Sequence, residues 1–377
     1  MASPLHAVTL RYLGHSSFLF TSSAGTRVVI DPYTSGEWPG LVFPSVHADR
    51  VLITHPHWDH DAWRQVQGKP KVTRGPGPAR KLRGFAIEGI AGRHARTAGA
   101  AIDFVNTVFV IETDGVRFCH LGDNAPLREV PGLAGKIGAV DVLMMPIDSE
   151  KRVLTYDQVE EWIEALAPRV VIPMHYRIPG LAFEHVTGLG TVDEWLASLA
   201  EGVPLVRLPA GTITLGPGGR SLPPPGSRSV WVFTLSGQTP PKKGPPPARE
   251  TTGREIRRQA EAALTEGDTA TALKLLKQAA SLDPGDGLAL QEIGFLYLGS
   301  SRPDRALEFF ERGARVADKA DPHTASLCWL GAGMALDVLG RREEALAAYR
   351  EVIAIGLNDE LQADTARRYL ERPYEED

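Results

Sequence analysis

The chain has 377 residues, of which 43% are hydrophobic and 23% are charged, and its 41 basic and 46 acidic side chains leave a net charge of −5. This length is too great for one ordinary hydrophobic core, so it predicts two domains, or one large domain with an appendage. The acidic balance argues against a nucleic-acid-binding surface, and the N-terminal residues contain neither a signal-like segment nor a run long enough to span a membrane.

Short apolar runs rich in β-branched residues fill the chain up to about residue 216, where they alternate with helical stretches and glycine-rich turns. This pattern is typical of an α/β domain. Two amphipathic helices are predicted, at residues 155–167 and 191–199. The strands are predicted at residues 8–13, 18–21, 27–30, 50–54, 104–113, 116–121, 140–145, 169–174 and 212–215.

The next segment, residues 217–252, is rich in proline, glycine and lysine around a single apolar run, VWVFTL at 230–235. Such a composition predicts a linker between a first domain at residues 1–216 and a second at residues 253–377. The apolar run is expected to be either an added edge strand or a tether that packs on the first domain.

From residue 253 onward, helical periodicity replaces the proline. Ala272 and Ala306 lie 34 residues apart, and each has a small residue twelve positions before it and a large apolar residue four positions after it. A third unit repeats this spacing around Ala345, after a shift of five residues assigned to a loop at 319–326. The small residues are Ala260, Gly294 and Gly333, and the large ones are Leu276, Phe310 and Tyr349.

These units resemble three tetratricopeptide repeats, and residues 360–371 are expected to form a helix that caps the last one. The alternative is a plain helical bundle, which would not need the fixed spacing of small and large residues. The two cysteines, Cys119 and Cys328, lie in different predicted domains. A structural disulfide is therefore not expected, and a cytoplasmic location fits the cysteine usage.

Three histidines and an aspartate fall within seven residues, THPHWDH at 54–60, although the whole chain has only 11 histidines. The cluster directly follows the predicted strand 50–54, just as Asp123 follows strand 116–121 and His175 follows strand 169–174. Because loops at the carboxyl ends of strands in open α/β sheets meet at one edge, these groups are expected to come together. A cluster without a ligand would leave several polar groups in need of separate partners.

This arrangement resembles the metallo-β-lactamase fold superfamily over roughly residues 5–216. The resemblance rests on the H-x-H-x-D-H motif, on the aspartate of VVIDPY before it, and on the later histidines and Gly-Asp pair. GHSSF at 14–18, GD at 122–123 and PMHY at 173–176 are more similar to the branch of ascorbate-6-phosphate lactonase and N-acylphosphatidylethanolamine phospholipase D. The resemblance implies an αββα sandwich, followed in this chain by an all-α tetratricopeptide-repeat domain.

The same resemblance implies two metal ions. One would be bound by His55, His57 and His94, the other by Asp59, His60 and His175, with Asp123 bridging them and Asp31 supporting the histidine loop without binding a metal. This imidazole and carboxylate set suits Zn²⁺, with Mn²⁺ or Fe²⁺ as alternatives. His120 is the rival of His94, which is preferred because it lies in the loop before strand 104–113, where the family places this ligand; a solvated loop histidine is the other interpretation of His94.

Three further residues have two interpretations each. His15, in GHSSF, either supports the metal ligands or faces the substrate, or it makes a structural hydrogen bond. Tyr176 either donates to a substrate oxygen or is a packed side chain. Trp38 belongs either to one wall of a substrate pocket or to an ordinary surface loop.

Two divalent ions held in this way would lower the pKa of a water between them and polarise the carbonyl or phosphoryl group under attack. Asp59 would orient that water or carry its proton to the leaving group. The predicted function is therefore a metal-dependent hydrolase of a small ester or lactone, an amide or a phosphodiester. The alternatives are a non-catalytic metal-binding scaffold and a nuclease of the same superfamily. The repeats are expected to bind a protein partner or a second copy of the chain.

Overall fold

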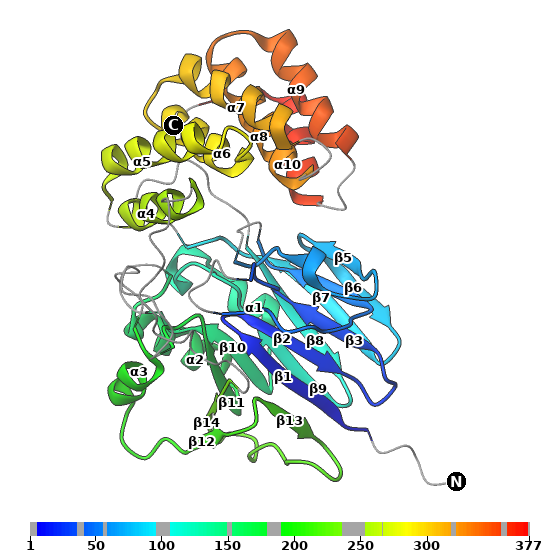
Figure 1. Cartoon of the computed structure of the whole chain (residues 1–377). Coiled ribbons are helices and arrows are strands. Elements are labelled where there is room, and N and C mark those ends of the chain that lie inside the picture. Colours follow the sequence, from blue (N-terminus) through cyan, green and yellow to red (C-terminus); the bar gives the residue numbers. More distant parts are fainter. Residues whose placement is uncertain are drawn as a thin grey trace. The chain divides into compact units, whose positions relative to one another are not determined.

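The computed structural model describes residues 6–35, 41–55, 59–95, 106–148, 153–178, 190–235, 253–265, 267–317, 322–355 and 360–375. Within these residues the chain forms two compact units. One contains two β-sheets with helices packed on them, and the other consists of helices alone (Figure 1). A search of the same residues finds no helix that is long and apolar enough to cross a membrane.

The first sheet has six strands in the order β13-β1-β2-β3-β4-β5. Their bounds are Val8–Gly14 (β1), Ser17–Thr21 (β2), Arg27–Ile30 (β3), Arg50–Ile53 (β4), Lys71–Arg74 (β5) and Thr212–Leu215 (β13). Strand β2 is antiparallel to both β1 and β3, and β4 is parallel to β3 and β5. The carboxyl ends of β1, β3, β4 and β5 therefore lie at one edge.

The second sheet has eight strands in the order β12-β14-β11-β10-β9-β8-β7-β6. Their bounds are Gly77–Leu82 (β6), Phe85–Ala91 (β7), Thr107–Thr113 (β8), Val116–His120 (β9), Val142–Pro146 (β10), Val170–Met174 (β11), Leu205–Leu208 (β12) and Ser229–Phe233 (β14). Strands β9 to β12 and β14 are parallel, and β8 is antiparallel to β7 and β9. Strand β7 consequently points the same way as β9.

The two sheets pack face to face through a core of large apolar side chains, in which Phe20 of β2 meets Phe118 of β9 with ring centroids 5.2 Å apart. Three helices cover the outer face of the second sheet: α1 (Leu133–Ile137), α2 (Tyr156–Leu166) and α3 (Val192–Ser198). The two longer ones begin at capping boxes, which confirms the helices predicted at 155–167 and 191–199. The outer face of the first sheet is covered by side chains of residues 41–48 and by the 3₁₀ helix Trp63–Gln65.

All nine predicted strands are present, although the strand predicted at 104–113 is described only from Thr107 onward. The apolar run at 230–235 corrects one expectation. It forms β14, which lies between β12 and β11 inside the second sheet and not at an edge. All five residues of β14 are buried. Complete burial fits a strand inside the sheet, and it is not expected of an edge strand with one side in solvent.

The helical unit consists of α4 (Gly253–Thr265), α5 (Thr269–Leu282), α6 (Gly287–Leu298), α7 (Pro303–Ala317), α8 (Pro322–Val338), α9 (Arg342–Ile355) and α10 (Glu360–Glu371). Helices α4 and α5, α6 and α7, and α8 and α9 pack as successive pairs, and α10 follows as the predicted last helix. The spacing of small and large residues has a direct cause. A Cβ atom on Gly294 would lie 2.5 Å from the Phe310 ring, and one on Gly333 would lie 2.3 Å from the Tyr349 ring.

The prediction of a loop at residues 319–326 is wrong for residues 322–326. Helix α8 begins at Pro322, so residues 322–326 are helical, and residues 319–321 lie outside the described part of the chain. Proline is favourable in the first turn of a helix because its missing N–H has no partner there. Thr324 and Ser326 are both buried, which ties this turn to the helical unit.

Candidate metal centre

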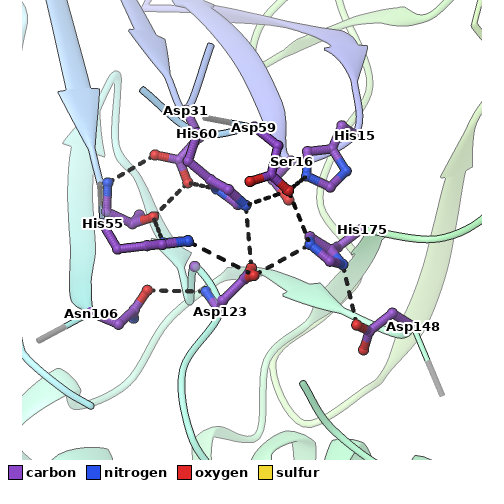
Figure 2. A network of polar contacts seen from close by, with 12 residues as sticks. His15, Ser16, Asp31, His55, Asp59, His60, Asn106, Asp123, Asp148 and His175 are labelled. Carbon is purple, nitrogen blue, oxygen red and sulfur yellow. Dashed lines mark hydrogen bonds and ion pairs between the residues drawn. The ribbon is translucent and has the colours of Figure 1, made fainter. Parts of the chain in front are cut away.

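Polar side chains from both sheets meet at one edge of the sandwich (Figure 2), after the carboxyl ends of seven strands. Each of them follows the carboxyl end of its strand: His15 after β1, Asp31 after β3, His55, Asp59 and His60 after β4, His94 after β7, Asp123 after β9, Asp148 after β10 and His175 after β11. All of these residues are buried. Two sequence-predicted residues, His57 and Trp38, lie outside the described residues.

Asp123 lies at the middle of the group. Its Oδ2 is 3.3 Å from Nε2 of His175 and 3.9 Å from Nε2 of both His55 and His94. Its Oδ1 is 3.6 Å from Nε2 of His60. The same carboxylate therefore faces four imidazoles, all through their Nε2 atoms.

The possible ligand atoms fall into two groups, within each of which all atoms lie within 4.8 Å of one another. One group is His55, His94 and Asp123, and the other is His15, Asp59, His60 and His175. These groups parallel the two ligand sets that the sequence suggested, apart from His57, which is not described, and His15, which is additional.

The other ring nitrogen of each imidazole is held by a group outside this centre. Nδ1 of His60 is 2.9 Å from Oδ2 of Asp31, Nδ1 of His175 is 3.3 Å from Oδ2 of Asp148, and Nδ1 of His94 is 2.6 Å from the carbonyl oxygen of Ala95. An N–H at Nδ1 that donates to these acceptors leaves the Nε2 lone pair facing the centre. This is the arrangement that metal-binding histidines adopt.

His55 completes the pattern through Thr54. The Thr54 hydroxyl donates to Oδ2 of Asp31 at 2.7 Å, and its oxygen lies 2.9 Å from Nδ1 of His55. Because the hydroxyl proton is committed to Asp31, the oxygen accepts from the His55 N–H. Asp31 also accepts from the backbone N–H of Thr54 at 2.8 Å, so one carboxylate orients two of the four imidazoles.

Two buried polar atoms at the middle of the group fit a metal ion. Nε2 of His60 and Oδ1 of Asp123 have no hydrogen-bond partner among the described residues. Buried polar atoms in folded proteins are normally satisfied, so such atoms call for a ligand. The imidazole and carboxylate donors, without any sulfur, suit Zn²⁺, Mn²⁺ or Fe²⁺.

The charges of the centre are strongly coupled. Burial raises the pKa of Asp123, but the imidazoles of His175 and His60 outweigh burial and hold this pKa well below its usual range. Burial lowers the pKa of His60, but Asp123 and Asp59 outweigh it and raise the pKa to about 9. The Asp123 carboxylate is therefore ionised, and a cation bound beside it would replace the protons of the histidines.

Three residues of the group have a left-handed backbone, with φ of 46° at Asp31, 53° at His15 and 56° at His175. Residues other than glycine seldom adopt this conformation, and where they do it often marks a functional site. Asp31 is held by a hydrogen bond from its N–H to the carbonyl of Leu52, and His175 by one from its N–H to the carbonyl of His15.

Two residues of the centre were not singled out in the sequence, Asp148 and Asn106. Asp148 orients His175, and Asn106 orients Asp123, because its Oδ1 accepts from the Asp123 N–H at 3.0 Å and its amide donates to the carbonyl of Leu121 at 2.8 Å. Asp148 could have been identified in the sequence, because it follows the predicted strand 140–145 just as the other candidate residues follow their strands. Asn106 had no such signal, since it precedes its strand.

The contacts of His120 support His94, and not His120, as the candidate ligand of the ion that His55 would bind. Nε2 of His120 donates to the carbonyl of Ser16 at 2.8 Å, and its Nδ1 accepts from the Gly122 N–H at 3.3 Å. Both ring nitrogens thus have partners away from the centre. Tyr176 is also buried, with its hydroxyl hydrogen-bonded to Tyr12, which agrees with the interpretation of a packed side chain.

Comparisons with known proteins agree with both units. A family profile described as a β-lactamase superfamily domain matches residues 9–175, and a tetratricopeptide-repeat profile matches residues 263–328. These matches confirm the predicted fold class, a metallo-β-lactamase domain followed by helical repeats.

Curated relatives resemble the first unit. A UPF0173 metal-dependent hydrolase of Archaeoglobus fulgidus is 30% identical over 44% of this chain and 82% of its own length. One of Thermococcus onnurineus is 29% identical over 45% of this chain and 84% of its own. A crystal structure from Thermotoga maritima, described as a Zn-dependent hydrolase of the metallo-β-lactamase superfamily, is 28% identical, with a TM-score of 0.46 over 60% of this chain and 98% of that one.

Proposed function

The chain belongs to the UPF0173 family of metal-dependent hydrolases, and from this premise we propose that its buried centre binds two divalent metal ions and hydrolyses a small substrate. The observation that carries the proposal is the convergence of four imidazole Nε2 atoms on the carboxylate of Asp123. Four imidazoles around one carboxylate would repel one another if all were protonated, whereas their neutral Nε2 lone pairs are suited to bind a divalent metal ion.

The two ligand groups support one assignment. His55 and His94 would hold one ion, and Asp59, His60 and His175 would hold the other. The resemblance adds His57, which lies outside the described residues, to the first set and implies that Asp123 would bind to both ions. Asp31 and Asp148 orient His60 and His175 from the far side. Zn²⁺ is the ion that we propose, with Mn²⁺ or Fe²⁺ as alternatives.

When bound, the two ions supply an acidified water and polarise the bond under attack. The chain contributes a carboxylate, Asp59. Its Oδ2 lies 3.7 Å from Nε2 of His60 and 3.9 Å from Nε2 of His175, so it borders the same space as the ligand atoms. Burial raises the pKa of Asp59, but His60 and His15 outweigh burial, and the lowered pKa keeps this carboxylate ionised, so that it can orient the attacking water by accepting a hydrogen bond from it.

The substrate class that we propose is a lactone or other small ester, an amide or a phosphodiester. A closer relationship to ascorbate-6-phosphate lactonase or N-acylphosphatidylethanolamine phospholipase D is a narrower form of this proposal. The net charge of −5 disfavours a nuclease. The repeats contribute a surface for a protein partner or for a second copy of the chain, in a cytoplasmic enzyme.

Metal analysis followed by a hydrolysis panel tests the proposal. The purified chain is loaded with Zn²⁺ or Mn²⁺, and lactones, phosphodiesters, N-acyl compounds and RNA are offered as substrates. Two ions per chain and turnover of one small substrate are expected, both lost in Asp123→Asn and both retained in the control Asp114→Asn, which lies in the turn after β8. A chain that takes up no metal would contradict the hydrolase, bound metal without turnover would indicate a scaffold, and cleavage of RNA alone would indicate a nuclease.

A further inference from the structure

His15 touches the proposed centre but belongs to neither predicted ligand set. Its side chain is fully buried, and its Nε2 lies 3.1 Å from Oδ2 of Asp59 (Figure 2). Its ring centroid is 4.3 Å from that of His175 and 5.1 Å from that of His60. The imidazole therefore fills the side of the centre on which Asp59, His60 and His175 meet.

The turn that carries His15 is fixed from several directions. The carbonyl of His15 accepts the Tyr12 hydroxyl at 2.9 Å and the His175 N–H at 3.2 Å. Gly14 before it has φ of 114°, and a Cβ there would lie 2.9 Å from the Tyr33 hydroxyl. With His15 itself at φ of 53°, the fold holds this ring in place at the cost of a conformation that its residue type seldom adopts.

The atom that His15 contacts decides what it can do. Oδ2 of Asp59 is also the oxygen that faces Nε2 of His60 and Nε2 of His175. A hydrogen bond to this oxygen restrains rotation of the carboxylate about its last bond. Without this hydrogen bond, the Asp59 carboxylate could rotate so that its other oxygen, or neither oxygen, faced the ion.

We propose that His15 is a positioning residue, which donates from Nε2 to Oδ2 of Asp59 and holds this carboxylate in the orientation that reaches the ion bound by His60 and His175. The inference rests on the two-metal centre proposed above. It assigns to the GHSSF segment a role in the site of Asp59, His60 and His175, because His15 contacts these three proposed ligands.

Two substitutions of His15 separate the hydrogen bond from the volume of the ring. His15→Gln keeps a donor at nearly the position of Nε2, whereas His15→Leu fills similar space without a donor. Both replacements tolerate the left-handed backbone equally poorly, so they are matched in that respect. His120→Leu removes an equally buried histidine whose hydrogen bonds go to Ser16 and Gly122, and it serves as the control.

The readout is a Co²⁺ titration of the metal-free full chain, followed by visible absorption and elemental analysis. We expect two ions in the wild-type chain. In His15→Leu one of the two sites should lose about 10- to 100-fold in affinity, the usual effect of losing a group that orients a ligand. His15→Gln should restore both the affinity and the wild-type absorption, and His120→Leu should keep both sites unchanged.

Different results overturn different statements. Fewer than two Co²⁺ ions in the wild-type chain would contradict the proposed centre itself. Wild-type affinity at both sites in His15→Leu would refute the positioning role. Equal losses in His15→Gln and His15→Leu would show that the ring itself is needed, as a ligand or as packing. If His15→Leu does not fold, a folded His15→Gln with a weakened site and altered absorption is sufficient to overturn the inference.

Discussion

The acceptors at the Nδ1 atoms of the imidazoles decide what the Nε2 atoms can bind. Asp31 is the clearest case, because its Oδ2 accepts from both His60 and Thr54. In Asp31→Asn an amide N–H replaces one acceptor. An amide that faces Nδ1 of His60 moves the ring proton to Nε2, where the ion would bind. Because Asp31 also fixes His55 through Thr54, we expect about 10- to 100-fold weaker metal binding at both ligand groups, measured by metal titration. Full affinity in Asp31→Asn would show that this carboxylate does not set the tautomer.

His94 and His120 give a second prediction at the scale of single residues. His94→Ala should lose one ion and most of the activity, since that ion keeps fewer imidazoles. His120→Ala should retain both ions and lose about 1–2 kcal/mol of stability, because it removes a buried hydrogen bond to the carbonyl of Ser16. Metal content and thermal unfolding of the two variants decide the matter. Loss of metal in His120→Ala, with two ions retained in His94→Ala, would reverse the assignment.

At the scale of elements, the close approach of paired helices in the repeats depends on glycine. Gly294→Leu forces a side chain into the Phe310 ring and should destabilise the helical unit by about 3 kcal/mol. Gly135→Leu in α1 is the matched control, because nothing lies within 4 Å of a Cβ there and leucine favours a helix over glycine by up to about 1 kcal/mol. Chemical denaturation measures both. Similar effects in the two variants would mean that the Gly294 contact can relax.

Two of the strands that were not predicted, β6 and β12, differ physically from the predicted ones. Buried strands such as β10, VLMMP, carry an unbroken apolar run that is visible without any structure. Strand β6, GPARKL, is the end strand of its sheet and leaves Pro78 to Lys81 exposed, so it has no apolar pattern to detect. Strand β12, LVRL, is another end strand with only one buried residue. Pairing with a neighbour, and not local hydrophobicity, makes these segments strands.

The site could be predicted where its signal is local. The H-x-H-x-D-H motif can be recognised because its histidines and aspartate lie so close together in the sequence. His94 follows β7, a strand that was not predicted, and was placed through the family resemblance. His15, Asn106 and Asp148 are single polar residues whose partners are distant in the chain. Their roles depend on contacts across 17 to 160 positions, such as the 44 that separate His15 from Asp59, and no local pattern encodes such contacts.

At the scale of the whole molecule, β14 decides where the first unit can be cut. A chain of residues 1–235 retains this strand and should fold and bind metal without the repeats, since it keeps the complete second sheet. A chain of residues 1–216 lacks it and leaves β11 and β12 without a shared neighbour, so it should aggregate. Size-exclusion chromatography and metal content of both truncations are the measurements. Aggregation of residues 1–235 would show that the repeats complete the core.

The interior position of β14 also sets an order of events during synthesis. Strand β12 ends at Leu208, and the strand that it pairs with ends at Phe233, 25 residues later. At a translation rate of about 5–20 residues per second, β14 is synthesised on the order of one to five seconds after β12. During that interval the hydrogen-bonding edge of β11, the strand that delivers His175, is open to any other strand in the cell. A pause in translation between these two strands would therefore lengthen the time during which this edge of β11 is unpaired in the nascent chain.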